Sequence, residues 1–386
     1  MSGSHRWAWV EIDLDAIAHN IRCLRDVVAP ADVWAIVKAD AYGHGAVEVA
    51  RAALDAGASG LGVALVSEGV ELRRAAVEAP ILVLSEQPRE AAPDIIAHGI
   101  TPTVSTTAGI DAIAAAAGDA GETGVSVHLK IDTGMHRVGA RPDEAAELAE
   151  YIAATGCLHL AGLFTHLAVA DEPDRPDTAA QLDIFDAVRA ALPPVDLVHA
   201  ANSAAALVHP RAHHSFVRAG IAVYGISPGP GVDDEAAMLR PALSLKARVS
   251  FVKRLPAGER LSYGLRYALP VDANIATVPL GYADGVRRNL SGLGVDVLIR
   301  GRRHPIVGTV TMDQLLVDCG DADVAAGDEV VLIGEQGGVG LRVEDWAGPL
   351  GTIGYEITCG LSARLRRIHV HRAGTDSSTG DGRSPQ

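Results

Sequence analysis

Hydrophobic and polar residues follow two different rhythms along the chain. In roughly the first 237 residues, short continuous apolar runs alternate with stretches in which apolar positions recur every three or four residues. The periodic stretches predict helices, of which the first is DLDAIAHNIRCLRDVV. The apolar runs predict eight strands: VWAIVKA, LGVAL, PILVLS, ITPTVS, VSVHLKID, LHLAGLFTHLA, DLVHAANS and SFVRAGIAVYG. Apolar strands separated by amphipathic helices are typical of a parallel sheet whose outer face is covered.

Eight strand–helix units in succession predict a closed (β/α)8 TIM barrel, which is an α/β fold. The competing interpretation is a doubly wound open sheet, which usually has fewer strands. When such a sheet binds a dinucleotide, it carries a GxGxxG sequence after its first strand, and this chain has none there. We therefore expect the barrel.

From about Met238 the apolar residues recur with a period of two, which predicts a second, mostly β domain. Its predicted strands are ALSLKARVSFVKRL, NIATVPLGYA, VDVLIRG, HPIVGTVTMDQLLVDC and DEVVLIG, and a helical stretch follows near TIGYEITCGLSARL. The opening WAWVEID is also strand-like and is expected to join this domain. We predict a barrel domain at 12–237, a β-rich domain formed by 1–11 and 238–372, and a polar, disordered tail at 373–386.

Charge and composition exclude several classes of protein. The 386 residues include 48 acidic and 33 basic ones, so the formal net charge of -15 argues against partners such as nucleic acid or an anionic membrane. No signal peptide is evident at the start, and no apolar run approaches the ~18 residues of a membrane helix. The four cysteines are scattered, which is typical of a reduced, cytoplasmic protein. No HExxH or spaced Cys/His cluster occurs, so no metal site is predicted.

Several reactive side chains fall at the carboxyl ends of predicted barrel strands, where TIM-barrel chemistry takes place. Taken singly, each has an ordinary structural explanation, such as a solvated lysine at a strand end or a hydrogen-bonded histidine. Together they predict an active site at one mouth of the barrel. They are Lys38, Lys130, Arg137, His166, Asn202, Ser203 and Arg218.

The residue types in this set indicate a particular cofactor. A buried lysine without metal ligands suggests a covalent link between its amine and a carbonyl group. Ser203, Tyr42 and the amides of Gly220 and Ile221 are suited to hold a phosphate. Arg218 is then left to face a ring nitrogen. The cofactor with these three features is pyridoxal 5'-phosphate.

Nine stretches spread in fixed order over roughly residues 5–370 resemble the alanine racemases, which are fold-type III pyridoxal-phosphate enzymes. They are AIVKADAYGHG, HLKIDTGMHRVG, THLAVAD, ANSAAA, RAGIAVYG, LSYGLRY, GYADG, TMDQ and GYEITC. The resemblance implies a TIM barrel followed by a β domain in a head-to-tail homodimer. It also implies interconversion of L-alanine and D-alanine, which supplies D-alanine for peptidoglycan.

The resemblance implies a role for each matching residue. Lys38 would bind the cofactor covalently and act as one base, and Tyr263 would be the opposite base, supplied to the partner's site. Lys130 matches a lysine that can be carbamylated in this family, an arrangement that steadies Arg137. The remaining implied sites are the phosphate (Tyr42, Ser203, Gly220, Ile221 and Tyr355), the pyridine nitrogen (Arg218, linked through His166 to Tyr263), the substrate carboxylate (Arg137 and the partner's Met312), supporting positions (Asn202 and Asp313) and the substrate entryway (Tyr282 and Arg288).

Three positions depart from the pattern expected of this family. RAGI stands for RPGI after Arg218, Thr309 stands where many relatives carry arginine, and LSARLRR lacks a common Val-Pro-Arg. None of the three touches the expected chemistry, and with Thr309 a contact in the substrate corridor is expected to be missing.

Arg218 favours racemisation over the alternatives. A guanidinium group keeps its proton, so it would leave a facing pyridine nitrogen unprotonated and weaken the ring as an electron sink. Simple return of the proton is then favoured over transamination, whereas a carboxylate here would indicate a decarboxylase. The alternatives that stay open are a racemase of serine or another small amino acid, a same-fold decarboxylase, a cofactor carrier without turnover, and a pyridoxal-free barrel enzyme acting on phosphorylated substrates.

Overall fold

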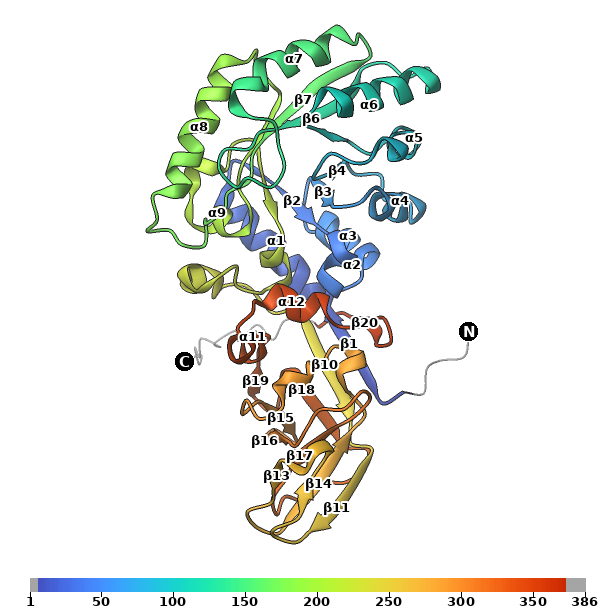
Figure 1. The fold of residues 1–386 in the computed structure, drawn as a ribbon, viewed down its shortest axis with the longest axis vertical. Helices are drawn as coiled ribbons and strands as arrows, with labels where there is room; N and C mark the ends of the chain where they lie inside the picture. The colour runs from blue at the N-terminus through green and yellow to red at the C-terminus, as the bar shows by residue number, and fades with distance from the viewer. Residues whose placement is uncertain (1–5, 373–386) are drawn as a thin grey trace, which may run out of the picture.

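A barrel of eight parallel strands forms the first part of the computed structural model, which describes residues 6–372 (Figure 1). The strands are β2 (Asp32–Ile36), β3 (Gly60–Val63), β4 (Ile81–Val83), β5 (Thr103–Val104), β6 (Val125–Lys130), β7 (Leu158–Phe164), β8 (Leu197–His199) and β9 (Phe216–Ala219). They pair in the orders β4-β3-β2-β9 and β5-β6-β7-β8. The ring closes through a parallel bridge between Leu82 and Thr101 and through the Arg218 N–H, which donates to the Ala201 carbonyl at 3.0 Å.

Helices cover the outside of this barrel, as the periodic stretches predict. They include α1 (Leu14–Val28), α3 (Ala46–Asp55), α4 (Val66–Arg74), α5 (Ala92–Ala97), α6 (Thr107–Ala120), α7 (Ala145–Ala154), α8 (Asp177–Ala191) and α9 (Ser203–Val208). Their apolar faces pack on the strands in one continuous core, and each of the eight predicted apolar runs contains a strand. The prediction of a TIM barrel with a second β domain is confirmed.

The β domain is built on a sheet of order β11-β14-β17-β16-β15-β18-β10-β1-β20, with β19 paired to β18. Its strands are β1 (Ala8–Asp13), β10 (Leu243–Arg248), β11 (Phe251–Leu255), β14 (Ala273–Val278), β15 (Asp296–Ile299), β16 (Arg302–Val307), β17 (Leu315–Asp318), β18 (Glu329–Gln336), β19 (Val339–Leu341) and β20 (Arg366–Val370). A separate hairpin pairs β12 (Arg260–Leu261) with β13 (Tyr267–Ala268).

Two long predicted strands of this domain are each divided in two. ALSLKARVSFVKRL becomes β10 and β11. HPIVGTVTMDQLLVDC becomes β16 and β17, because the chain leaves the sheet at Gly308, which has a positive φ of 69°. The helical stretch near TIGYEITCGLSARL is shorter than predicted and contains only α12 (Gly354–Cys359). α11 (Glu344–Leu350) was not predicted from the sequence.

The first strand joins the two parts of the molecule. β1 pairs antiparallel with β10 and parallel with β20, so the opening WAWVEID lies inside the β sheet. Its last residue, Asp13, caps α1 by accepting from the N–H groups of Asp15 at 3.0 Å and Ala16 at 3.2 Å. The chain thus passes directly from the sheet into the first barrel helix, and α12 and β20 lie at this junction (Figure 1).

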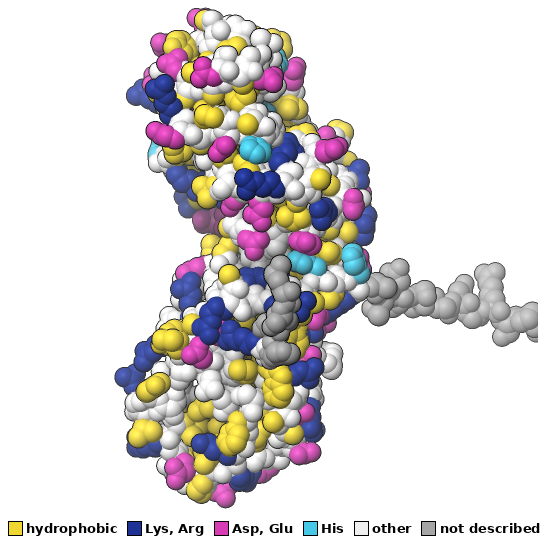
Figure 2. Space-filling model, turned by 90° about the vertical axis from the view of Figure 1, so that its right-hand side faces the viewer, with side chains coloured by type: hydrophobic (Ala, Val, Ile, Leu, Met, Phe, Trp, Pro, Cys, Tyr) yellow, Lys and Arg dark blue, Asp and Glu magenta, His cyan; other side chains and the backbone are white. Residues whose placement is uncertain are grey.

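The predicted tail at 373–386 lies outside the described residues. On the face shown in Figure 2, acidic and basic side chains are interspersed over both parts of the elongated molecule. Among the described residues, none of the helices combines the length and the apolar character needed to cross a bilayer.

Candidate active site

Lys38 is held at the barrel mouth by an unusual backbone segment. β2 ends at Ile36, earlier than predicted, and Lys38 begins the turn α2 (Lys38–Gly43). The four residues after Lys38, at 39–42, have φ of 53–54° and form a left-handed turn, which costs roughly 1–2 kcal/mol per residue for L-amino acids. Such a segment persists only where its surroundings stabilise it.

One carboxylate supplies part of this stabilisation. Glu68 on α4 accepts from the Ala39 N–H at 2.6 Å, and its other oxygen accepts from the N–H groups of Ala64 at 2.8 Å and Leu65 at 3.0 Å. Glu68 therefore joins the ends of the first two barrel strands directly beside Lys38. Sequence reasoning missed it, because a glutamate on an amphipathic helix is indistinguishable from a solvated surface residue.

Basic groups gather at this mouth. Burial lowers the pKa of Lys38, and the nearby Arg137 lowers it further, while Glu68 opposes the shift. Lys130 is 6% exposed and donates to the Leu84 carbonyl at 3.1 Å. Burial, followed by the charges of Arg218, Arg137 and Lys38, lowers its pKa to about 7. This concentration of positive charge suits a ligand that carries anionic groups.

Replacing Lys130 by methionine is expected to stabilise the fold near neutral pH. The pKa of this lysine is about 7 in the folded chain, against an ordinary value of 10.5, so between these pH values the unfolded chain binds a proton that the folded chain does not. The cost of burying Lys130 therefore grows as the pH falls from 10.5 to 7 and is constant below 7. Lys130→Met removes a cost on the order of a few kcal/mol, most fully below pH 7.

Urea denaturation across this pH range, in bicarbonate-free buffers, measures the effect. The exposed lysine of β11 supplies the matched control, Lys253→Met, whose free energy of unfolding should follow the unmodified chain at every pH. A gain in Lys130→Met that did not change with pH would contradict this account.

Arg218 lies at the base of the site, 4% exposed. It donates to the carbonyls of Thr165 at 2.7 Å and Ala200 at 3.0 Å, and to the Nδ1 atoms of His199 at 2.7 Å and His166 at 3.3 Å. Burial lowers the pKa of Arg218 to about 9, which still leaves the group charged at neutral pH.

The two histidines that face Arg218 are neutral acceptors. Burial, followed by the charge of Arg218, holds the pKa of His166 and of His199 well below the ordinary value. Because His199 accepts at Nδ1, its proton is on Nε2, which contacts Nδ1 of His128 at 2.9 Å. Sequence reasoning missed His199 and His128, although His199 closes β8 at the same mouth as the predicted residues.

Two hydroxyl groups converge on the backbone of Gly220, and the ring of Tyr355 lies next to one of them. Ser203 Oγ accepts from the Gly220 N–H at 2.8 Å, and a Cβ atom at Gly220 would lie 2.6 Å from Tyr42 Oη and 3.7 Å from Ser203 Oγ. The Tyr42 and Tyr355 rings have centroids 6.0 Å apart. Burial raises the pKa of both tyrosines, so both remain protonated donors. Glycine at 220, with Ile221 next to it, thus leaves a cradle lined by donors, which fits an anionic group such as a phosphate.

Asn202 orders the backbone that presents Ser203. Its Oδ1 accepts from the Ala205 N–H at 3.0 Å and caps α9, and its Nδ2 donates to the Leu167 carbonyl at 3.3 Å. The Asn202 side chain therefore links the ends of two barrel strands.

The other predicted site residues lie on the β domain, apart from the barrel mouth. Tyr263 follows β12, and in Figure 1 its hairpin partner β13 lies toward the free end of that domain, far from α2. The Tyr263 side chain is 74% exposed, and Met312 and Tyr282 are also exposed. Within one chain, the structure brings together the barrel residues but does not bring Tyr263 to Lys38.

Charged side chains fix two loops of the β domain that carry predicted site residues. Asp313 pairs with Arg364 at 2.7 Å. Asp284, in the same short turn as Tyr282, is fully buried and accepts from both terminal nitrogens of Arg6 at 2.6 and 2.7 Å. The 3₁₀ turn Arg288–Leu290 follows along the chain.

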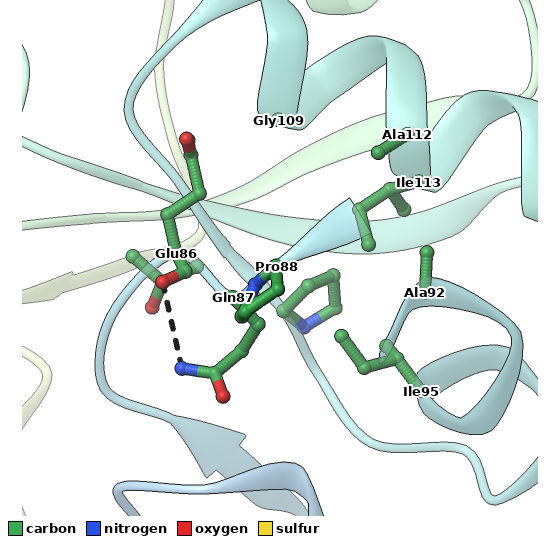
Figure 3. A pocket seen from close by; sticks show the side chains of 10 residues that line it. Glu86, Gln87, Pro88, Ala92, Ile95, Gly109, Ala112 and Ile113 are labelled. Atoms are coloured by element: carbon green, nitrogen blue, oxygen red, sulfur yellow. Dashed lines mark hydrogen bonds between the residues drawn. The ribbon is translucent and has the colours of Figure 1, made fainter. Parts of the chain in front are cut away.

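Two pockets differ sharply in size. An open one of about 490 Å³ lies beside Tyr263 and is lined by Ser262, Tyr263, Gly264, Leu265, Thr311, Gln314 and Leu316. The other, in the barrel (Figure 3), is about 10 Å³, too small for more than one water. Beside it the Glu86 carboxylate accepts from the Ser105 N–H at 2.6 Å and from Thr106 Oγ1 at 2.7 Å, next to the start of α6. The Figure 3 pocket is therefore a small gap in the side-chain packing and not a ligand site.

Comparison with known proteins places this geometry in context. Residues 12–228 match the family model "Alanine racemase, N-terminal domain", and residues 242–369 match "Alanine racemase, C-terminal domain". An alanine racemase of Symbiobacterium thermophilum is 46% identical over 369 residues, covering 94% of this chain and 97% of that protein.

Solved structures show the same similarity. The alanine racemase from D-cycloserine-producing Streptomyces lavendulae superposes with a TM-score of 0.90 at 39% identity, covering 96% of this chain and 98% of the other. A histidine racemase from Leuconostoc mesenteroides superposes with a TM-score of 0.87 at 30% identity, covering 95% and 99% of the two chains.

Proposed function

Because this chain belongs to the alanine racemase family over nearly its whole length, we propose that it is a pyridoxal-phosphate-dependent isomerase that interconverts L-alanine and D-alanine. The observation that carries the proposal is the buried, charged Arg218, a guanidinium group that only donates hydrogen bonds and keeps its protons. The donor cradle at Gly220 supports the cofactor independently, because it suits a phosphate.

The barrel residues divide between two ends of the cofactor. Lys38 would bind it covalently, and Tyr42, Ser203, Tyr355 and the amides of Gly220 and Ile221 would hold its phosphate. Arg218 would donate to its ring nitrogen, with His166 beside it. When bound, pyridoxal phosphate withdraws electrons from the Cα atom of an amino acid and acidifies the Cα proton.

Racemisation requires a base on each face of the substrate, because a single base tends to return the proton to the face it came from. Lys38 serves one face, and its lowered pKa makes the neutral amine more accessible. Tyr263 of the partner subunit serves the other face. The exposure of Tyr263, and the distance of its hairpin from α2 in Figure 1, support a homodimer in which each chain supplies this tyrosine to its partner.

Substrate binding is assigned to residues around these bases. Arg137 and the backbone of the partner's Met312 would bind the carboxylate, with Lys130, as a carbamate, steadying Arg137. Asn202 and Asp313 would support these groups through the hydrogen bond and ion pair described above. Tyr282 and Arg288 would line the entryway from the β domain.

Arg218 also determines the type of reaction. A cation that only donates would keep the ring nitrogen an acceptor, so negative charge stays close to Cα and the proton returns quickly.

We assign the barrel to 12–237, the β domain to 1–11 and 238–372, the site of action to the cytoplasm, and the product to cell-wall synthesis.

Incubation with L-alanine in deuterated water tests the proposed function. Both enantiomers of alanine should form, with deuterium at Cα in the newly formed D-alanine, as chiral chromatography with mass spectrometry can measure. Serine belongs in the same panel because small apolar pockets reject an added hydroxyl group poorly, and histidine belongs there because a histidine racemase has a similar structure. Retention of a single enantiomer without deuterium, in the presence of pyridoxal phosphate, would contradict racemisation, and release of carbon dioxide would indicate the decarboxylase alternative.

A further inference from the structure

Tyr263 lies in a strained hairpin turn. β12 and β13 pair through Leu261 and Tyr267, and the turn between them contains two non-glycine residues with positive φ. Ser262 has φ 58° and ψ −173°, and Leu265 has φ 48°. These are conformations that favour glycine, so the turn needs support from its surroundings. Because the Tyr263 side chain is largely exposed, its position depends on the backbone of this turn.

Two hydroxyl groups connect the turn to the segment after β16. Thr309 Oγ1 donates to the Tyr263 carbonyl at 2.8 Å, and Ser262 Oγ donates to the Thr309 carbonyl at 2.6 Å. The two hydrogen bonds run in opposite directions between the same two backbone segments. Thr309 is 7% exposed, so little water competes for its hydroxyl group.

The segment that carries Thr309 is itself fixed. The Val310 N–H donates to Ser291 Oγ at 2.8 Å. Gly308 permits the close approach, because a Cβ atom there would lie 2.9 Å from Ser262 Cβ. Two short hydrogen bonds therefore connect the turn of Tyr263 to a segment that is itself held in place.

We infer that Thr309, together with Ser262, is a positioning residue that sets the orientation of Tyr263 for proton transfer. The inference rests on the proposed function, in which Tyr263 acts in the partner's site. The bond depends on a hydroxyl group on Cβ. The family resemblance leads one to expect arginine at position 309. Arginine has no such hydroxyl group, so only the threonine of this chain can make this hydrogen bond.

Replacing Thr309 by valine tests the inference, because valine keeps the shape and removes the hydroxyl group. Loss of alignment at a catalytic group reduces turnover more than binding, so Thr309→Val is expected to lower kcat about tenfold with KM changed less than about twofold. Thr309→Ser restores the hydroxyl group and should return kcat to within about twofold of the unmodified chain. Steady-state racemisation of alanine in both directions measures both values.

A threonine with the same kind of bond serves as the matched control. Thr155, at the end of α7 in the distant part of the barrel, donates from Oγ1 to the Ile152 carbonyl at 2.7 Å. Thr155→Val removes this hydrogen bond, and with it the one that Oγ1 accepts from the Leu158 N–H at 3.2 Å, so it perturbs the fold at least as much as Thr309→Val but far from Tyr263, and kcat should stay unchanged. A fall in kcat for Thr155→Val as large as that for Thr309→Val would show a general loss of stability.

A spectroscopic measurement reports the position of Tyr263 without depending on turnover. The chain contains seven tyrosines, so labelling with 3-fluorotyrosine gives a small set of ¹⁹F resonances, and the one lost in Tyr263→Phe belongs to Tyr263. Thr309→Val should shift or broaden that resonance, whereas Thr309→Ser and Thr155→Val should leave it in place.

The outcomes separate this inference from the proposed function. An unmodified chain that failed to racemise alanine would refute the function, and the ¹⁹F resonance would still decide whether Thr309 positions Tyr263. An unmoved resonance in Thr309→Val, an unchanged kcat, or a Thr309→Ser variant as impaired as Thr309→Val would each overturn the inference. Should Thr309→Val fail to fold, Ser262→Ala removes the reciprocal bond and is judged by the same two measurements.

Discussion

Replacing Lys38 by alanine is expected to abolish racemisation, lowering turnover by at least about 10⁴-fold, because the change removes the proposed cofactor attachment and one of two bases together. The variant should also lose the visible absorption that purified protein acquires with pyridoxal phosphate. Chiral product analysis and absorption spectroscopy measure the two effects.

The fold itself should survive this substitution. Lys38 is only partly buried, and the turn that follows it is held by hydrogen bonds to its backbone. Lys253→Ala, on the exposed face of β11, provides a control with the same loss of charge and should keep full activity. Full turnover by Lys38→Ala would refute the mechanism, and a collapsed circular-dichroism spectrum would show that the loss has a structural cause.

Mixing two inactive variants is expected to restore activity. If Tyr263 serves the partner's site, a heterodimer of Lys38→Ala and Tyr263→Phe chains contains one site with both bases intact and one with neither. Random pairing of equal amounts makes half of the dimers mixed, so about a quarter of the unmodified activity should return. Activity measured after subunit exchange, with the two chains carrying different affinity tags, gives this fraction.

The doubly substituted chain supplies the opposite control. When Lys38→Ala/Tyr263→Phe is paired with an unmodified chain, a shared site leaves both sites of the heterodimer broken. A site made within one chain would instead leave the unmodified half fully active. Activity that stayed in proportion to the unmodified chain after verified exchange would refute the shared site.

The barrel was predictable from the sequence, because its strands are buried on both faces and are read as apolar runs separated by helices. The chemistry at strand ends was readable for the same reason: a charged residue such as Lys38 or Arg218 stands out directly beside an apolar run. The positions of these residues follow from the fold, while their roles remain proposals.

Features that depend on distant partners were not predictable. The left-handed turn after Lys38 occurs in a sequence, ADAY, whose residues all favour right-handed conformations. It is stabilised by Glu68, 29 residues away, and by the packing of Tyr42 on Tyr224, with ring centroids 5.0 Å apart. The local sequence contains no signal for such long-range contacts.

The β domain was predictable in type but less so in detail. A period of two indicates strands, yet it does not show where the chain leaves the sheet, and the excursion between β16 and β17 carries both Thr309 and Met312. β19 and β20 are short strands without strong alternation. β20 lies at the sheet edge and is only partly buried, so its hydrophobic pattern is weak.

The pairing of β1 with β20 has a consequence for how a cell makes this protein. A ribosome releases β1 before all the other described strands and β20 after them, so the nascent chain must wait for the barrel and the rest of the β sheet before β1 gains this parallel neighbour. Until then the outer edge of β1 presents unpaired backbone groups to other chains, even though the barrel strands have already emerged. Premature termination a few codons before β20 would thus release a polypeptide with all of its proposed site residues and an open edge prone to aggregation.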